Sequence, residues 1–111
     1  MGNGNLVVGN VALEMVEALQ PLVSRIKRQD RSLADQLVRA ASSVVLNVAE
    51  ADYSDPGNKR SRLFTAAGSA NEVRAAVKLA VAWKYCACGE VETAQQLLDR
   101  VIAMLWRLTR G

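Results

Sequence analysis

Apolar residues in this chain recur at spacings of three and four and nowhere alternate with polar residues as in a half-buried strand. The first such stretch predicts a helix from about Asn10, a good N-cap, to about Gln29. Pro21 falls inside it and predicts a kink or an early break, because proline removes one backbone donor. Residues 1–9 are rich in Gly and Asn and are predicted to be a flexible N-terminus. The side chains expected to face the core are Val16, Leu19, Val23 and Ile26.

The second helix is predicted to begin at Ser32, whose hydroxyl can cap it, with Asp35 three residues on in a near capping box. It ends near Ala51, just before the strongest cluster of helix breakers in the chain at residues 52–58. Because that connection is short, the second and third helices should pack as antiparallel neighbours.

The third helix is predicted to start at Pro56 with Asp55 as its cap, or one turn later, and to continue to about Ala87. Gly89 is expected to end it as a C-terminal cap. The fourth helix then runs to about Thr109. The acidic residues that open it, with the right charge for the helix dipole, are Glu90 and Glu92.

Four helices joined by short connections predict one all-α domain over residues 10–111, folded as an antiparallel up-and-down four-helix bundle. Apolar residues span an arc of about 200° on the fourth helix, wider than a bundle helix usually buries, and the third helix has a similar excess. This surplus favours a homo-oligomer over the alternative, a monomer with a more apolar surface. The expected oligomer interface is formed by Leu79, Trp83, Ile102 and Trp106.

Two polar stripes interrupt the apolar pattern. Ser43, Asn47 and Glu50 stand at i, i+4 and i+7 on the second helix. Ser69 and Glu72 stand at i, i+3 on the third. Because an unpaired buried polar group costs roughly 1–3 kcal/mol, the two stripes are expected to meet.

Two interpretations of this meeting point are open. Glu50 and Glu72 would form a carboxylate pair for acid–base or metal chemistry, or they would belong to a structural network with Arg39 or Arg74. The structural interpretation is favoured, because no His or Cys lies at helical spacing from either carboxylate. Gly68, next to the second stripe, is expected to allow a close approach between helices.

The residue inventory excludes several chemistries. The chain has no His, so it has neither a Ser-His-Asp nor a Cys-His nucleophile pair. Its two cysteines, Cys86 and Cys88, form a lone C-x-C without a second pair to complete a zinc site. We therefore expect no enzymatic activity, no metal and no cofactor. The absence of a disulfide framework, a signal peptide and a run of about 18 apolar residues predicts a cytoplasmic protein without a membrane span.

The net charge of +3 permits binding to nucleic acid without demanding it. The basic residues of the third and fourth helices are interpreted either as a solvated face or as a surface that contacts phosphates. No interleaved aromatic residues that would support base stacking are recognised among them, so binding to RNA or DNA should not depend on base sequence. The candidate contacts are Lys59, Arg60, Arg62, Arg74, Lys78, Arg100, Arg107 and Arg110.

Two segments resemble a known family. Residues 33–50 read LADQLVRAASSVVLNVAE, and residues 66–73 read AAGSANEV. They are similar to the motifs L-x-x-Q-L-x-R-A-x-x-S-I-x-x-N-I-A-E-G and A-x-G-S-x-x-E-L of the small proteins encoded in intervening sequences of bacterial 23S rRNA genes. The glycine that usually follows the first motif is Ala51 here, so the second helix is expected to end differently.

The resemblance implies an antiparallel four-helix bundle, often assembled as a ring-like homopentamer. It also implies kinship with the accessory variability protein of diversity-generating retroelements, a basic pentamer that binds nucleic acid and a reverse transcriptase. Two functions are therefore expected as alternatives. One is an oligomeric nucleic-acid-associated accessory factor, and the other is a protein-interaction scaffold that binds no nucleic acid.

Overall fold

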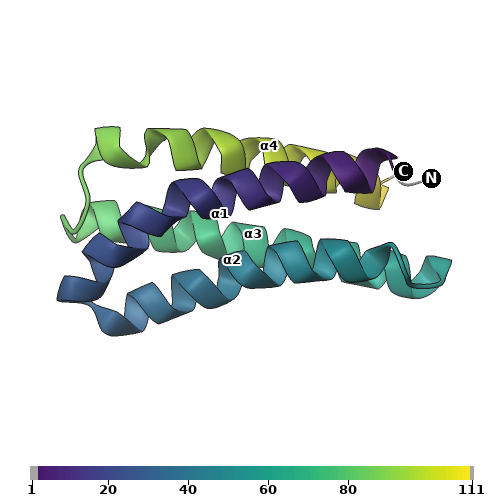
Figure 1. Ribbon diagram of the computed structural model, residues 1–111, viewed down its shortest axis with the longest axis horizontal. Helices are drawn as coiled ribbons and strands as arrows, with labels where there is room; N and C mark the ends of the chain where they lie inside the picture. Colours follow the sequence, from purple (N-terminus) through teal and green to yellow (C-terminus); the bar gives the residue numbers. More distant parts are fainter. Residues whose placement is uncertain (1–2, 111) are drawn as a thin grey trace.

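Four long helices alternate in direction in the structure, a computed structural model that describes residues 3–110, with side chains from Leu6 onward. In Figure 1, α1 and α4 lie along one side of the bundle and α2 and α3 along the other. The long axis of 42 Å matches the length of a 27-residue helix at about 1.5 Å per residue. The predicted all-α, antiparallel four-helix bundle is confirmed. The helices are α1 (Asn3–Gln29), α2 (Arg31–Ala51), α3 (Pro56–Ala82) and α4 (Glu92–Arg110), with a short 3-10 helix, η1 (Cys88–Val91), before α4.

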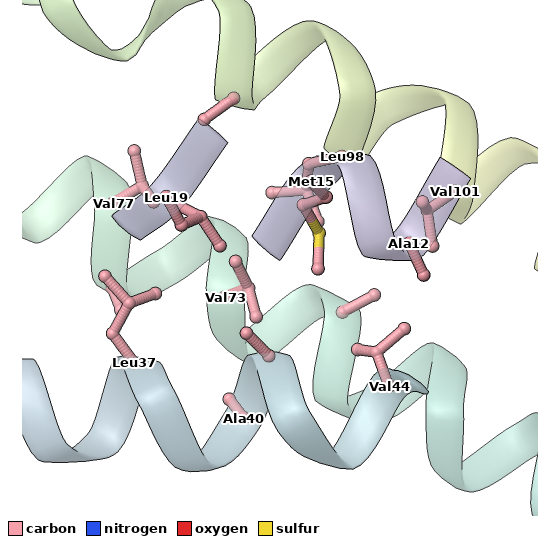
Figure 2. Packing of buried hydrophobic residues seen from close by; sticks show 14 of the residues in the cluster. Ala12, Met15, Leu19, Leu37, Ala40, Val44, Val73, Val77, Leu98 and Val101 are labelled. Atoms are coloured by element: carbon pink, nitrogen blue, oxygen red, sulfur yellow. The ribbon is translucent and has the colours of Figure 1, made fainter. Parts of the chain in front are cut away.

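The core is a column of aliphatic and small side chains drawn from all four helices. Figure 2 shows Met15 of α1 and Leu98 of α4 pointing into the same interior as Leu37 of α2 and Val73 of α3. Each of these four side chains is almost inaccessible to solvent. Burying one such side chain contributes about 1.5–3 kcal/mol, so this column is the main source of stability.

Helix α1 begins at Asn3 rather than near Asn10, so residues 3–9 are helical where a flexible segment was predicted. Residues 1–2 lie outside the described residues. Val8 and Val11 are buried against the core, and this packing stabilises two further helical turns whose local sequence is unfavourable. The prediction at Pro21 was a kink or an early break. The break is absent, since α1 continues through the proline to Gln29 with buried residues on both sides of it.

The face of α1 that packs into the core is rotated about the helix axis relative to the predicted face. Leu19 and Ile26 are buried as expected, but Val16 and Val23 are half-buried at the edge that faces α2. The stretch Leu6–Gln29 is long and apolar enough to cross a membrane by length and composition. A core helix of a soluble protein passes the same test, and one third of its most apolar window is buried inside this bundle.

Helix α2 is capped by Asp30, not by Ser32 as predicted. One carboxylate oxygen of Asp30 accepts a hydrogen bond of 3.0 Å from the Leu33 N–H, and the other accepts one of 3.1 Å from the Tyr85 hydroxyl. Asp30 is the single residue between α1 and α2. Its carboxylate therefore both caps α2 and binds Tyr85, which lies in the segment that follows α3. The predicted end of α2, at Ala51, is confirmed.

Helix α3 starts at Pro56 with Asp55 as its cap, as predicted, and the Asn58 N–H donates to the Asp55 carboxylate at 2.9 Å. This hydrogen bond, together with one from the Asn58 side chain, lowers the pKa of Asp55. The helix ends at Ala82, one turn earlier than the predicted Ala87.

The chain reverses at Lys84, which has a φ of 66°, rather than at Gly89, which lies in η1 with a negative φ. The Lys84 N–H donates to the Val81 carbonyl and the Tyr85 N–H to the Ala80 carbonyl, each at 2.9 Å. This pair of bonds is a Schellman motif, in which glycine is the usual residue at the left-handed position. A lysine there bears a steric cost of about 1 kcal/mol.

Candidate functional surfaces

The polar stripes of α2 and α3 meet, as predicted. The hydroxyls of Ser43 and Ser69 lie 2.8 Å apart, and the Asn47 amide donates to the Ser43 carbonyl at 2.9 Å and to its hydroxyl at 3.1 Å. Ser69 is buried, whereas the other two are half-buried. Within the described part of the chain, no buried side-chain polar atom lacks a partner. These bonds therefore set the position of α2 against α3, and they compensate the free-energy cost of removing the polar groups from water.

The two carboxylates of the motif do not form a pair. Glu50 makes an ion pair of 2.6 Å with Arg62. Residues whose numbers sum to about 112 face each other across this antiparallel contact, because Ser43 meets Ser69 and Glu50 meets Arg62. Glu72 therefore lies opposite Ala40, about 15 Å along α2 from Glu50 at 1.5 Å per residue. The carboxylate-pair interpretation is wrong, and the described residues contain no cluster of three or more potential metal ligands.

Glu72 instead lines a polar hollow of about 200 Å³ between α2 and α3, which we call the α2–α3 hollow. The predicted alternative partner Arg74 is on the other side of α3, where it forms an ion pair of 2.7 Å with Asp99 of α4. Gln36 is a lining residue that was not among the predicted site residues, although it occupies the fixed Gln position of the first family motif. The hollow is lined by Gln36, Arg39, Ala40, Ser43, Ser69 and Glu72.

Gly68 does not mediate a close helix approach. It lies on the exposed side of α3, and a Cβ atom added there would meet nothing within 4 Å. The prediction from its small size is therefore wrong for the single chain, and Gly68 lowers the helix propensity of α3 without an intramolecular compensation.

The basic residues concentrate on one half of the bundle. Helices α3 and α4 carry eight basic and three acidic residues, a net charge of +5, whereas α1 and α2 carry five basic and four acidic residues, a net charge of +1. The structure separates three candidates from the rest. Arg62 and Arg74 are held in ion pairs with Glu50 and Asp99, and Lys59 is half-buried in the first turn of α3. The remaining five are exposed and define what we call the basic surface: Arg60, Lys78, Arg100, Arg107 and Arg110.

Two aromatic rings accompany the basic surface, which the sequence interpretation missed. The Arg60 guanidinium lies 5.5 Å from the ring centre of Phe64, and that of Arg110 lies 3.7 Å from Trp106. Both pairs have i, i+4 spacing, so the sequence could have predicted that each arginine lies next to its aromatic ring on the helix surface. Since Arg74 meets Asp99, Phe64 faces the last turns of α4, so both pairs lie at the same end of the bundle. Both rings are more than half exposed.

The predicted oligomer residues are only partly available. Leu79, Trp83 and Trp106 are exposed, but Ile102 is half-buried and packs against the core of its own chain. A second apolar area, not predicted, lies on the outer sides of α1 and α2 around a groove of about 220 Å³ between these helices. We use the name α1–α2 surface for the exposed Val38, which lines this groove, together with three exposed apolar residues of the same two helices, Leu6, Leu13 and Leu46.

The two cysteines are free thiols with different environments. Cys86 is buried and Cys88 is exposed. Burial raises the pKa of the Cys86 thiol, Glu90 raises it further, and Arg25 opposes them. Arg25 and Glu90 also form an ion pair that joins α1 to η1. A buried thiol with a raised pKa is a poor nucleophile, so Cys86 has a structural environment.

These features define a helical-bundle protein with a basic surface and exposed apolar areas. Its described residues form no recognisable catalytic constellation. The sequence profile of the 23S rRNA-intervening sequence protein family matches residues 4–107, and the chain belongs to this family. None of the curated proteins matches the sequence significantly. The fold is similar to a crystal structure of a protein of unknown function from the S23 ribosomal protein family of Bacteroides thetaiotaomicron. The two are 18% identical with a TM-score of 0.86, and the match covers 94% of this chain and 99% of the other.

Proposed function

We propose that this protein is a non-enzymatic, homo-oligomeric accessory factor that binds the phosphate backbone of RNA or DNA without sequence preference. The observation that carries the proposal is the unequal distribution of charge, with a net +5 on α3 and α4 against +1 on α1 and α2. Clustered Lys and Arg side chains attract phosphates and release their counterions, which supplies most of the affinity of sequence-independent binding. The expected setting is the cytoplasm.

The aromatic pairs favour single-stranded over double-stranded nucleic acid. Phe64 and Trp106 are exposed beside arginines, and unpaired bases can stack on such rings whatever their identity. A duplex keeps its bases stacked inside, so it would use only the charges of the basic surface.

Self-association through the α1–α2 surface leaves the basic surface free. This surface combines apolar residues with a nearly neutral charge, whereas joining two α3–α4 halves would bring like charges together. A homopentamer, as implied by the family resemblance, would pool a net charge of about +15 and have a mass of about 60 kDa.

Nucleic-acid binding is tested by fluorescence anisotropy with a labelled single strand of about 20 nucleotides and its duplex, over roughly 50 to 200 mM salt. The double variant Arg60→Gln/Lys78→Gln should weaken binding and reduce the slope of log K against log salt by about 1.4 for the single strand. The control Lys27→Gln/Arg28→Gln removes two charges from the end of α1 and should bind like the unmodified protein. Absence of binding at the lowest salt, or equal losses in both double variants, would refute the proposal.

Oligomerisation is tested by light scattering. The unmodified protein should have a mass several times 12.0 kDa. Leu46→Asp, on the α1–α2 surface, should reduce it to that of one chain, whereas Leu79→Asp should not. The reverse result would favour the interface predicted from the sequence pattern, and a monomer at high concentration would contradict both.

The second candidate function is a protein-interaction scaffold without nucleic-acid binding. The observation that favours it is the number of exposed large apolar side chains on all four helices. By the family resemblance, its partner would be a bacterial protein such as a reverse transcriptase. A complex with that partner that forms equally well after nuclease treatment and in the Arg60→Gln/Lys78→Gln variant would support this alternative over the first.

A further inference from the structure

The α2–α3 hollow is lined by two side chains of opposite charge that form no ion pair with any described residue of the chain. Arg39 on α2 and Glu72 on α3 both line it, and both are exposed. The three ion pairs among the described residues involve other side chains, and neither the Arg39 nor the Glu72 side chain has a hydrogen bond to the protein. The hollow therefore offers one cationic wall and one anionic wall.

A hydroxyl with remaining hydrogen-bonding capacity also lines the hollow, about one turn along the helices from Arg39 and Glu72. Asn47 donates to the hydroxyl oxygen of Ser43, which lies 2.8 Å from that of Ser69. A hydroxyl has one donor and two acceptor positions, so this single bond leaves the Ser69 hydroxyl with capacity toward the hollow that it lines. Ser69 is only 8% exposed, so its position is set by packing and not by solvent.

The polar hollow continues into an apolar one. A neighbouring hollow of about 140 Å³ shares Gln36 and Glu72 with it and extends toward the end of α3. The two together form one groove along the α2–α3 contact, polar at the serines and apolar toward Leu79. The apolar part is lined by Leu33, Ala75, Ala76 and Leu79.

We propose that this groove binds a free α-amino acid with an aliphatic side chain. Its carboxylate pairs with Arg39, its ammonium group pairs with Glu72, and its side chain lies between Leu33 and Leu79. A simple anion would be repelled by Glu72 and a simple cation by Arg39, whereas a zwitterion satisfies both walls. This site is separate from the basic surface and does not depend on nucleic-acid binding.

The test is a titration of the ¹⁵N-labelled protein with L-leucine, followed by NMR chemical shifts. We expect saturable shifts at residues 33–43 and 69–79, with a half-saturation near 1 mM for so small and open a site. Two analogues that keep the side chain, 4-methylpentanoate without the ammonium group and 3-methylbutylamine without the carboxylate, should each bind at least about tenfold more weakly.

The variants Arg39→Gln and Glu72→Gln should each weaken L-leucine binding at least about tenfold, and Arg39→Lys should restore part of it. Ala75→Leu, at an exposed position, should fill the apolar part of the groove. It should therefore weaken the binding of L-leucine more than the binding of free glycine, which has no side chain. Arg28→Gln and Glu14→Gln on α1 are the matched controls and should bind L-leucine normally. The same spectra report whether each variant is folded.

Three outcomes would overturn the proposal. The first is the absence of saturable shifts up to about 20 mM ligand, a concentration that detects any site of useful affinity. The second is equal binding of the two analogues. The third is a loss of thermal stability in both Arg39→Gln and Glu72→Gln without any ligand-induced shift, which would mean that the two side chains close on each other as an ion pair.

Discussion

Replacing Gly68 by alanine should stabilise this protein. Gly68 lies in the interior of α3, on its exposed side, and an added Cβ meets no atom within 4 Å. No contact is gained or lost, so the change measures helix propensity alone, which favours alanine by about 1 kcal/mol. For a domain of 111 residues, that corresponds to a rise in melting temperature of about 4 °C.

The measurement is thermal and urea unfolding followed by circular dichroism at 222 nm, on protein whose mass has been checked by light scattering. Ala75→Gly, two turns away on the same exposed side of α3, is the matched control and should lower stability by a similar amount. A decrease in melting temperature for Gly68→Ala would refute the reasoning. If the oligomer dissociated at the same time, Gly68 would be in contact with a neighbouring subunit, and the interface would have to include α3.

Three other predictions concern the segment between α3 and α4. Lys84→Gly should raise the free energy of unfolding by about 1 kcal/mol, because glycine adopts the φ of 66° without strain; a loss of stability in urea unfolding would contradict this. Burial, followed by the hydrogen bond and charge of Asp30, raises the pKa of Tyr85, so the folded state holds this proton more tightly than the unfolded state. Stability from this source is fully present below about pH 10 and is lost as the pH rises above it. The melting temperature should therefore depend less on pH in Tyr85→Phe than in the unmodified protein. Tyr53→Phe, at a position that is 93% exposed, should show the same pH dependence as the unmodified protein. A thiol reagent should modify Cys88 rapidly in the native protein and Cys86 only on unfolding, and rapid modification of both would show that the end of the bundle is open.

Local signals predicted some helix ends correctly and others not. The start of α3 was predictable because Asp55 and Pro56 act on backbone groups within three residues of themselves. The cap of α2 was not, because both Asp30 and Ser32 are good capping residues. The hydroxyl of Tyr85, 55 positions away, binds the Asp30 carboxylate, and no local pattern contains this contact.

The same limit applies to the candidate sites. The meeting of the polar stripes was predictable, since Ser43 and Ser69 are too polar to be buried without partners. Which carboxylate met which arginine was not, because helical periodicity does not set the offset of α2 along α3. The observed alignment separates Glu50 from Glu72 and leaves the latter in the α2–α3 hollow.

The sequence by itself determined the number of helices and their antiparallel order, because these depend on the helical period and on short connections. Only the tertiary structure decided the alignment of neighbouring helices, the position of the reversal at Lys84 and the gathering of positive charge on α3 and α4. The physical reason is that these features depend on how side chains from distant segments pack, and helical periodicity contains no information about the offset of one helix along another.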